Sequence, residues 1–485
     1  MNNIKRNLTM LTDFYELTMG NGFIKSGMKD TIAYFDMFYR RNPDNGGFAI
    51  TAGLAQVIDY LKQLKFDSCD IEYLRKRNIF NEEFLSYLEE FKFQCDVWAI
   101  PEGTPVFPGE PLITTRGPLP QVQLVETMLL TTINHQSLIA TKANRVVRAA
   151  KGRPVMEFGS RRAHGYDGAI LGARASYIGG CIGTACTIAD RDYQVPAIGT
   201  MAHSWVQSFD SEYEAFAAYA KAYPDSTTLL IDTYNVLKSG VPNSIRVAKE
   251  VLEPNGHRLK GVRIDSGDIA YLSKEARKLF DAAGMKDCKI VASNSLDEHL
   301  ITNLLDQGAC IDSFGVGESL ITSKSCPVFG GVYKEAAIEK GGEIIPKIKL
   351  SENEEKITNP GFKKVYRFYD KISGKALGDV VALHNEIIDF NKPYILFDPI
   401  STWKKTKLEN YNVKELQVQI FKKGVCVYES PSLKDIREYC LSEIETLWDE
   451  ILRFENPHKY YVDLSKELWK LKYEMINKYR TGDEI

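Results

Sequence analysis

The sequence predicts an α/β protein with an irregular or incomplete (β/α) barrel at its centre, flanked by an N-terminal α+β domain and a C-terminal peripheral domain. Between residues 150 and 330, short apolar runs alternate with helical stretches at intervals of roughly 30 residues, which is typical of parallel βαβ units. Polar residues follow nearly every predicted strand. This favours a barrel over an open doubly wound sheet, because an open sheet concentrates such residues at one switch point.

The central domain is expected to span residues 136–345. Its strands are predicted near residues 154–158, 195–200, 227–232, 260–265, 288–293 and 310–316. Its helices are predicted at residues 211–221, 241–252, 269–280 and 296–305. The last three helices are each followed by a glycine, which is the expected stop signal for a helix.

Residues 1–135 lack this rhythm. Residues 31–39 alternate like a sheet strand, and residues 97–100 form a short apolar run before a turn-rich stretch. We therefore expect an antiparallel sheet in an N-terminal α+β domain. Residues 346–485 contain a strand-like stretch at 416–421 and amphipathic helices at 433–453 and 462–478, so they are predicted to form a third domain.

Composition limits the classes of function. The net charge of −3 gives no global reason to expect nucleic acid or an anionic membrane as a partner. The nine cysteines lack the spacing of a disulfide framework or a zinc site, which favours reduced thiols in a cytoplasmic protein. No run of ~18 apolar residues is present, so no membrane span is expected.

Two kinds of loop could bind an anion. Arg161 and Arg162 directly follow a predicted strand, and the guanidinium group suits phosphate or carboxylate. A solvated loop with surface ion pairs is an equal alternative. The small-residue turns at 179–184 and at Gly315 to Gly317 could offer backbone N–H groups to an anion, although such turns are common.

The stretch RIDSGD at residues 263–268 is the densest candidate. Strand alternation sends Arg263 and Asp265 to the same face. An arginine beside carboxylates suits a sugar phosphate, with the cation on phosphate oxygens and the acids on ribose hydroxyls or Mg²⁺. For Asp268 we expect a simpler role as the N-cap of the following helix.

His203 is the third candidate, at the end of the predicted strand near 195–200. A lone histidine is usually structural or exposed. A metal ligand would need companions, and the chain has no His-x-His motif. A nucleophile or general base, oriented by a nearby acid, is the remaining interpretation, and spacing leaves these alternatives open.

Several motifs together resemble the nicotinate phosphoribosyltransferase family. They are TDFYELTM at 12–19, EFGSRR at 157–162, GTMAHS at 199–204, VRIDSGD at 262–268, FGVG at 314–317 and VFGGVY at 328–333. The resemblance implies that nicotinate and phosphoribosyl diphosphate give nicotinate mononucleotide and diphosphate, coupled to ATP hydrolysis. ATP and Mg²⁺ are the implied cofactors, and the metal ligands are not implied by any motif.

The resemblance also implies roles for individual residues. The histidine that ATP phosphorylates maps onto His203, and such a charge can bias loop closure and substrate affinity. Tyr15 would cover the pyridine ring from the neighbouring subunit of a homodimer, and Phe158 would stack on its other face. The further implied substrate contacts are Arg161, Thr184, Thr200, Arg263, Asp265, Ser266, Gly315 and Gly317.

One position departs from the family pattern. Glu318 follows Gly317 where a threonine is expected in a phosphate-contacting loop. Because a carboxylate repels phosphate, we expect the contact to come from the Gly315 to Gly317 backbone or from Ser319.

Two rival functions remain at this point. A nicotinamide-using transferase on the same fold would place an acid near the ring, whereas the stretch around Thr184 offers hydroxyl groups, which suits nicotinate. A degenerate barrel acting as a binding scaffold would not need the intact His203, Arg263 and Asp265.

Overall fold

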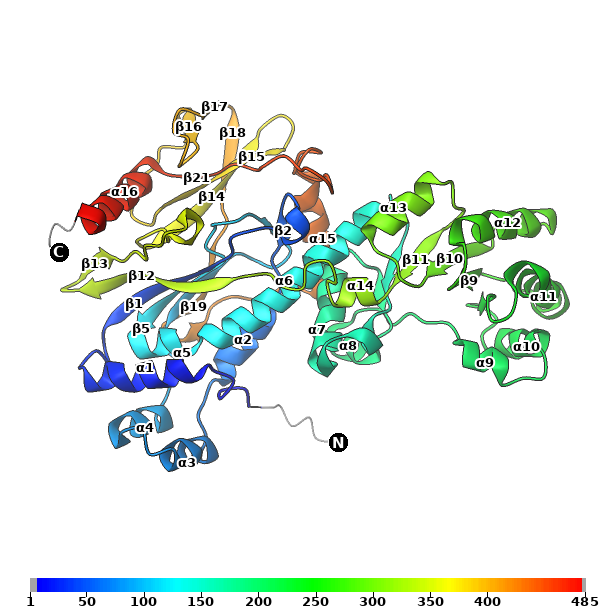
Figure 1. The fold of residues 1–485 in the computed structure, drawn as a ribbon, viewed down its shortest axis with the longest axis horizontal. Helices are drawn as coiled ribbons and strands as arrows, with labels where there is room; N and C mark the ends of the chain where they lie inside the picture. The colour runs from blue at the N-terminus through cyan, green and yellow to red at the C-terminus, as the bar shows by residue number, and fades with distance from the viewer. Residues whose placement is uncertain (1–6, 482–485) are drawn as a thin grey trace. The chain divides into compact units, whose positions relative to one another are not determined.

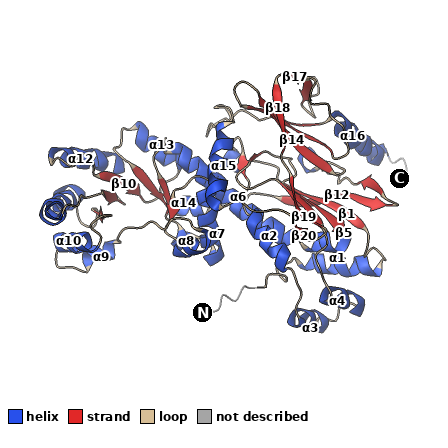
Figure 2. Ribbon diagram, turned by 180° about the vertical axis from the view of Figure 1, so that it is seen from behind, coloured by secondary structure: helices blue, strands red, loops and turns tan. Residues whose placement is uncertain are grey.

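The computed structural model describes residues 7–481, which fold into two compact units (Figure 1). The first unit contains the described residues up to Leu138 and those from Val328 onward, and the second contains Ile139–Pro327. Both units combine helices and strands (Figure 2). The N-terminal and C-terminal segments therefore share one unit, whereas the sequence predicted separate domains with boundaries near 135 and 345.

The main sheet of the first unit explains why the two segments belong together. Its strand order is β13-β12-β1-β5-β3-β19-β20, and its pairings are antiparallel. Strand β3 comes from the N-terminal segment and β19 from the C-terminal segment, and the two strands pair directly. The strands are β1 (Ile32–Phe38), β3 (Asp96–Ala99), β5 (Ile113–Pro118), β12 (Val332–Lys340), β13 (Glu343–Pro346), β19 (Val418–Lys422) and β20 (Val425–Cys426).

A second sheet of the first unit has the order β18-β14-β15-β21. Its strands are β14 (Lys363–Asp370), β15 (Ala376–Leu383), β18 (Tyr411–Glu415) and β21 (Val462–Leu464). Two small pairs join β2 (Ala49–Ile50) to β4 (Pro105–Val106) and β16 (Tyr394–Phe397) to β17 (Lys405–Leu408). The helices are α1 (Phe14–Lys25), α2 (Leu54–Gln63), α3 (Ser68–Lys76), α4 (Glu82–Glu89), α5 (Leu119–Leu124), α15 (Leu433–Glu445) and α16 (Lys466–Thr481). Helix α6 (Glu126–Ala149) begins in the first unit and ends in the second.

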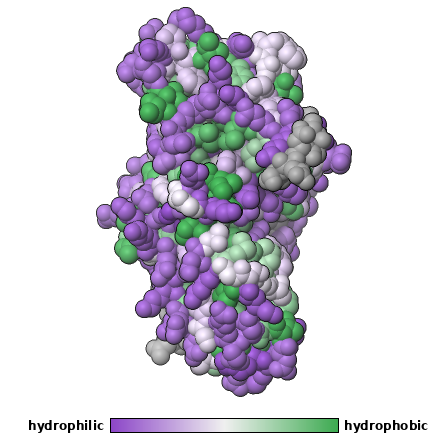
Figure 3. Space-filling model, turned by 90° about the vertical axis from the view of Figure 1, so that its left-hand side faces the viewer, coloured by the Kyte–Doolittle hydropathy of each residue, from purple (hydrophilic) through white to green (hydrophobic). Residues whose placement is uncertain are grey.

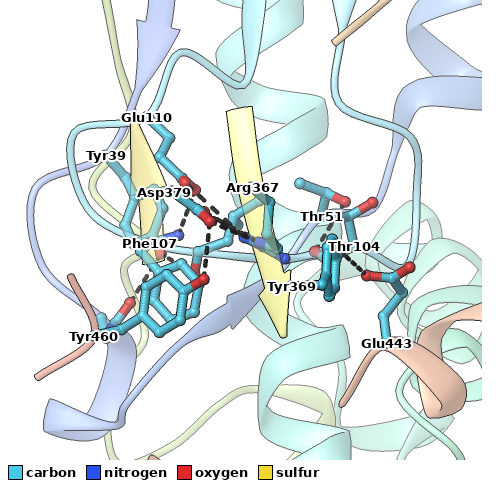
Figure 4. A network of polar contacts seen from close by, with 12 residues as sticks. Tyr39, Thr51, Thr104, Phe107, Glu110, Arg367, Tyr369, Asp379, Glu443 and Tyr460 are labelled. Atoms are coloured by element: carbon cyan, nitrogen blue, oxygen red, sulfur yellow. Dashed lines mark hydrogen bonds and ion pairs between the residues drawn. The ribbon is translucent and has the colours of Figure 1, made fainter. Parts of the chain in front are cut away.

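A buried polar network lies inside the first unit (Figure 4). The Arg367 side chain on β14 is fully buried and donates two hydrogen bonds of 2.9 and 2.6 Å from Nε and Nη2 to Asp379 on β15. Tyr460 donates a third hydrogen bond of 2.9 Å to the same carboxylate, and its ring stacks on Phe107. Burial, and then the charge of Asp379, hold the pKa of Glu110 well above its usual range. Arg367 and Asp379 therefore form a close ion pair, and Glu110, with its raised pKa, lies 3.9 Å from the same guanidinium.

The second unit is built on six parallel strands in the order β7-β6-β11-β10-β9-β8. Most strands pair with the strand that follows them in the chain. The exceptions are β7 and β8, which lie at opposite ends of the sheet, and β6 and β11, which pair although they are the first and last strands in the chain. Within Ile139–Pro327 the sheet is thus parallel as predicted, but no closed barrel is present. The strands are β6 (Val155–Glu157), β7 (Gly183–Thr184), β8 (Thr228–Leu230), β9 (Gly261–Ile264), β10 (Lys289–Ser293) and β11 (Ser313–Val316).

Helices of the second unit alternate with these strands. They are α7 (Gly165–Ile178), α8 (Thr187–Tyr193), α9 (His203–Gln207), α10 (Glu212–Ala222), α11 (Val241–Val247), α12 (Ile269–Ala282), α13 (Glu298–Asp306) and α14 (Glu318–Ile321). The predicted helices at 211–221, 269–280 and 296–305 are confirmed by α10, α12 and α13. After α11, the chain continues through a π-helical turn at Ala248–Leu252.

Three sequence predictions of secondary structure are wrong in part or in whole. Of the helix predicted at 462–478, Val462–Leu464 form strand β21, and helix α16 begins only at Lys466. Residues 195–200 form only an isolated bridge between Ala197 and Thr184 instead of a strand. Pro196 has no N–H group for a strand ladder, which limits pairing there. The helix predicted at 433–453 ends at Glu445, because α15 gives way to turns.

Among residues 7–481, no helix is both long and apolar enough to cross a membrane. Figure 3 shows that hydrophilic side chains cover much of one face, with hydrophobic residues in separate patches.

Candidate functional site

The candidate site lies at the carboxyl ends of strands in the second unit. Arg263 is on β9, Asp265 follows that strand, Ser293 ends β10 and Asp232 follows β8. Parallel strands end at the same edge of a sheet, so these side chains are brought together. The hydrogen bonds described below join them into one cluster.

Arg263 is the cation of this cluster. Its Nη1 donates a hydrogen bond of 2.8 Å to the Thr200 hydroxyl, and its Nη2 donates one of 3.2 Å to the Met201 carbonyl. Its Nε atom is buried and has no hydrogen-bond partner. Burial lowers the pKa of Arg263, while the charges of Asp265 and Asp232 oppose that effect. A buried guanidinium with a free N–H is suited to bind an anionic ligand.

Two aspartates surround the carboxyl end of β9. Asp232 Oδ2 accepts hydrogen bonds of 3.1 Å from the Asp265 backbone and 2.6 Å from the Ser266 hydroxyl. Asp232 Oδ1 is buried and has no partner. Ser293 donates a short hydrogen bond to Asp265 Oδ1. The two carboxylates are thus fixed in place, and Asp232 keeps one oxygen available for a ligand.

His203 is the first residue of α9 and stands beside these aspartates. Its Nδ1 lies 3.1 Å from the Thr233 hydroxyl, and its Nε2 lies 3.9 Å from Asp265 Oδ2. The side chain is 40% exposed, so part of it is open to solvent. The structure therefore brings His203, Arg263 and Asp265 together, as the sequence predicted.

The Phe158 ring packs against Gly315 of β11, and the Phe158 backbone lies close to Gly317, which follows that strand. A Cβ atom added to Gly315 would lie 2.4 Å from Phe158 Cδ2, so only glycine allows this approach of the ring. Gly317 precedes α14, and an added Cβ there would lie 3.3 Å from the Phe158 carbonyl oxygen. A substrate role for Gly315 and Gly317 stays a prediction, while the packing role of Gly315 is explicit.

Thr184 is committed to an internal hydrogen bond. Its hydroxyl donates a hydrogen bond of 2.5 Å to Glu157 Oε2 and accepts one of 3.0 Å from the Cys186 backbone. Glu157 is fully buried, and burial raises its pKa. Thr184 therefore anchors the ends of β6 and β7, and its predicted contact with nicotinate is not evident from the geometry.

The charged residues of the remaining loops are more exposed. Arg161 and Arg162 lie in a short 3₁₀ turn after β6, and the charge of Arg161 reaches Arg263. Glu318 forms an ion pair of 2.9 Å with Lys324. This pair partly offsets the repulsion of phosphate that the sequence led us to expect, because the lysine neutralises the carboxylate. Asp268 accepts a hydrogen bond of 3.0 Å from the Tyr271 backbone, which confirms its predicted role as the N-cap of α12.

Tyr15 lies in the first unit, on α1. It is 43% exposed. Burial, and then the neighbouring Glu126 carboxylate, raise the pKa of the Tyr15 hydroxyl. The Tyr15 side chain is thus partly exposed, and its hydroxyl interacts with Glu126 of α6.

Sequence reasoning assigned no role to four residues of this region. Asp232, Thr233, Ser293 and Glu157 hold the side chains of predicted site residues by hydrogen bonds. Asp232 and Ser293 end predicted strands, and that position was the only available signal for them. Thr233 carried no such signal, because it lies one residue beyond the apolar run.

The residues present do not form a ready-made metal cage. In the part of the chain that the structure describes, no group of three or more His, Cys, Asp and Glu side chains could hold a metal ion. The pair Asp232 and Asp265 offers oxygen ligands only. Such a pair suits Mg²⁺ that is also held by phosphate oxygens of a substrate.

The fold and the site together define an α/β protein whose parallel sheet gathers an arginine and two aspartates at the carboxyl ends of its strands. The chain matches the nicotinate phosphoribosyltransferase N-terminal domain at residues 10–134, the family model itself at 154–356 and the C-terminal domain at 362–472. The chain belongs to the nicotinate phosphoribosyltransferase family.

Individual relatives match over nearly the whole chain. The nicotinate phosphoribosyltransferase of Bacillus subtilis is 42% identical over 479 residues, which cover 98% of this chain and 97% of the relative. The human enzyme of the same name is 32% identical over 519 residues, with 95% of each chain covered. The crystal structure of human nicotinic acid phosphoribosyltransferase superposes with a TM-score of 0.84 at 30% identity, covering 96% of this chain and 100% of that chain.

Proposed function

We propose that this protein transfers the phosphoribosyl group from phosphoribosyl diphosphate to nicotinate, giving nicotinate mononucleotide and diphosphate in NAD salvage. The observation that carries this proposal is Arg263, which is buried beside two carboxylates and keeps a free Nε–H. Such a group binds a carboxylate or phosphate ligand. Family membership and the full-length relatives support the same reaction.

The chemistry needs charge stabilisation more than a strong base. The pyridine nitrogen attacks the anomeric carbon, the bond from that carbon to the diphosphate oxygen breaks, and diphosphate leaves. Positive charge builds on the sugar and negative charge on the leaving group, so cations such as Arg161 and Arg263 stabilise the latter. We assign Asp265 and Ser266 to the ribose hydroxyls and Phe158 to stacking on the pyridine ring.

We further propose that ATP phosphorylates His203 and that Mg²⁺ accompanies the phosphates. The partial exposure of the His203 side chain supports the first step. The free oxygen of Asp232 and the nearby Asp265 are the groups that would hold Mg²⁺, which neutralises phosphate charge when bound. Phosphohistidine adds negative charge beside the two aspartates, so its formation and hydrolysis can change substrate affinity and product release.

Three broader expectations belong to the same proposal. We infer that the second-unit sheet is an incomplete barrel. Its last strand in the chain, β11, pairs with its first, β6, as in a barrel, and the sheet is open between β7 and β8. We infer a homodimer in which Tyr15 reaches the site of the partner, supported by the partly exposed side chain of Tyr15. A cytoplasmic location is supported by the nine cysteines, whose spacing lacks that of a disulfide framework, since reduced thiols are typical of that compartment.

Turnover with two substrates tests this function. Purified protein is incubated with phosphoribosyl diphosphate and either nicotinate or nicotinamide, with and without MgATP, and mononucleotide is quantified. We expect nicotinate mononucleotide, stimulated by ATP. A preference for nicotinamide would reassign the substrate, and no mononucleotide under any condition would favour a binding scaffold.

A further inference from the structure

Glu318 interacts with two cations near the carboxyl ends of β6 and β11. The Lys324 ammonium forms an ion pair of 2.9 Å with its carboxylate. Arg162, the last residue of the 3₁₀ turn after β6, also acts on it through its charge. The hydrogen bond and charge of Lys324, and then the charge of Arg162, lower the pKa of the Glu318 carboxyl, so it is ionised at neutral pH. All three side chains are exposed, so a ligand in solution can reach them.

The turn that carries Lys324 is held by hydrogen bonds. Ser323 is fully buried and has a left-handed backbone conformation, with a φ of 43°. Its hydroxyl donates a hydrogen bond of 2.9 Å to the Cys326 carbonyl. The Lys142 ammonium donates one of 2.7 Å to the Ser325 hydroxyl. Because serine rarely adopts a left-handed conformation, these contacts stabilise a turn that the free chain would avoid, and they fix where the Lys324 backbone lies.

The ion pair borders the two turns that the sequence predicted to bind an anion. Glu318 directly follows Gly317, and Arg162 lies three residues after Gly159. A Cβ atom added to Gly159 would lie 2.7 Å from the Gly317 carbonyl oxygen, so the turn after β6 packs directly on the end of β11. The cations of both turns and the carboxylate of Glu318 therefore belong to one edge of the parallel sheet.

We propose that Lys324 binds phosphate oxygens of a diphosphate group, and that Glu318 competes with this group for Lys324 and Arg162. This inference rests on the proposed function. It adds a pair of residues that sets the affinity for phosphoribosyl diphosphate and for the diphosphate product.

The exposed position of the pair makes such an exchange possible. An exposed ion pair is weak, so a ligand with several negative charges can replace the carboxylate as the partner of Lys324. When diphosphate leaves, Glu318 takes up the lysine again, and this lowers the affinity for the departing product. Without the Glu318 carboxylate, both cations would be available to phosphate from the start, and diphosphate would be held more tightly.

The test measures binding directly. Inorganic diphosphate is titrated into the full-length protein in the presence of Mg²⁺, at low and at high NaCl concentration, and its Kd is obtained by calorimetry. The variants are Glu318→Gln, Lys324→Gln, the two combined, and Lys324→Arg, which keeps the charge. Lys151→Gln is the matched control, because Lys151 forms an exposed ion pair of 2.9 Å with Asp306. Lys151 precedes β6 and Asp306 ends α13 before β11, so the control pair lies at the opposite edge of the sheet.

The two single variants should have opposite effects. Lys324→Gln should weaken diphosphate binding about fivefold and reduce its dependence on salt, because one cation is lost. Glu318→Gln should tighten binding about threefold, because the competing carboxylate is lost. The combined variant should lie between them, and Lys324→Arg and Lys151→Gln should stay near the parent. The KM for phosphoribosyl diphosphate should shift in the same directions.

Each result bears on a separate part of the proposal. Unchanged or weaker binding in Glu318→Gln would overturn the competition, and unchanged binding in Lys324→Gln would overturn the phosphate contact. An equal loss in Lys151→Gln would assign the effect to net charge and overturn both roles. Turnover by the parent separates this inference from the proposed function. A parent that forms no mononucleotide contradicts the function, whereas an active parent whose Kd none of the variants alters contradicts only the pair.

Discussion

The Arg263 guanidinium donates a hydrogen bond of 2.8 Å to the Thr200 hydroxyl, which joins the β9 strand to the loop that precedes His203. The same guanidinium bonds to the Met201 carbonyl, so Arg263 shapes this loop, while its buried Nε atom has no hydrogen-bond partner. Any change at Arg263 should therefore act on the anionic substrate and on the position of the loop.

Arg263→Lys should raise the KM for nicotinate and lower kcat/KM by about 10- to 100-fold, because a lysine cannot reproduce the planar set of donors. Steady-state kinetics with nicotinate as the varied substrate checks this. Arg258→Lys is the matched control, since Arg258 forms an exposed ion pair with Asp287. Parent-like kinetics in Arg263→Lys would remove Arg263 from the binding site.

Asp265→Asn should lower kcat by about 100-fold, because it removes a carboxylate placed to hold ribose hydroxyls and Mg²⁺. The measurement is kcat at saturating nicotinate and phosphoribosyl diphosphate. Asp268→Asn is the control three residues away, because asparagine also caps a helix. If both variants lost activity equally, a local folding defect would explain the loss better than chemistry at Asp265.

His203→Ala should abolish the stimulation by ATP and leave a slow transfer that does not need ATP. The reason is that the reacting carbon and the pyridine nitrogen are not changed by this substitution. Initial rates with and without MgATP give the ratio directly. Equal stimulation of variant and parent would refute phosphorylation at His203.

Part of this structure was predictable, and the limits have physical causes. Periodicity identified the helices α10 and α12, and apolar runs identified the strands β9 and β10, because a helix buries one face whereas a strand inside a parallel sheet is buried on both. Alternation cannot tell which strands pair over long separations, so the pairing of β3 with β19, and with it the shared first unit, was missed.

In the candidate site, too, some features could be predicted from the sequence and others could not. Strand alternation predicted that Arg263 and Asp265 lie on the same face at the end of one strand, because side chains two residues apart point to the same side. The identity of a hydrogen-bond partner depends on side-chain direction, so Thr233 gave no signal. Gly315 was expected to bind an anion through its backbone. The structure shows that its missing side chain makes room for the Phe158 ring, and the sequence does not reveal this contact.

Asp463→Asn should flatten the pH dependence of stability between about pH 4 and 7. Burial, and then the charge of Asp398, raise the pKa of Asp463 to about 7. The unfolded state therefore loses this proton at lower pH than the folded state. As pH rises through this window, the free energy of unfolding should fall by up to ~1.4 kcal/mol per pH unit in the parent. Urea unfolding at several pH values measures the slope, and equal slopes in both proteins would contradict the raised pKa.

Arg367→Met should destabilise the first unit by about 3–5 kcal/mol, because it leaves Asp379 charged and buried without its cation. Chemical unfolding followed by tryptophan fluorescence measures the loss. The exposed pair of Arg75 and Glu82 is the control, and Arg75→Ala should cost less than about 1 kcal/mol.

The double variant Arg367→Met with Asp379→Asn decides whether the ion pair itself or the orphaned charge matters. Removing both charges avoids a buried unpaired carboxylate, so the double variant should regain a large part of the stability that Arg367→Met loses. The pKa of Glu110 should then stay raised, because burial, the largest cause of its shift, is unchanged. A double variant as unstable as the sum of its two single variants would instead show that Arg367 stabilises the unit chiefly through its packing on Phe107 and Tyr460.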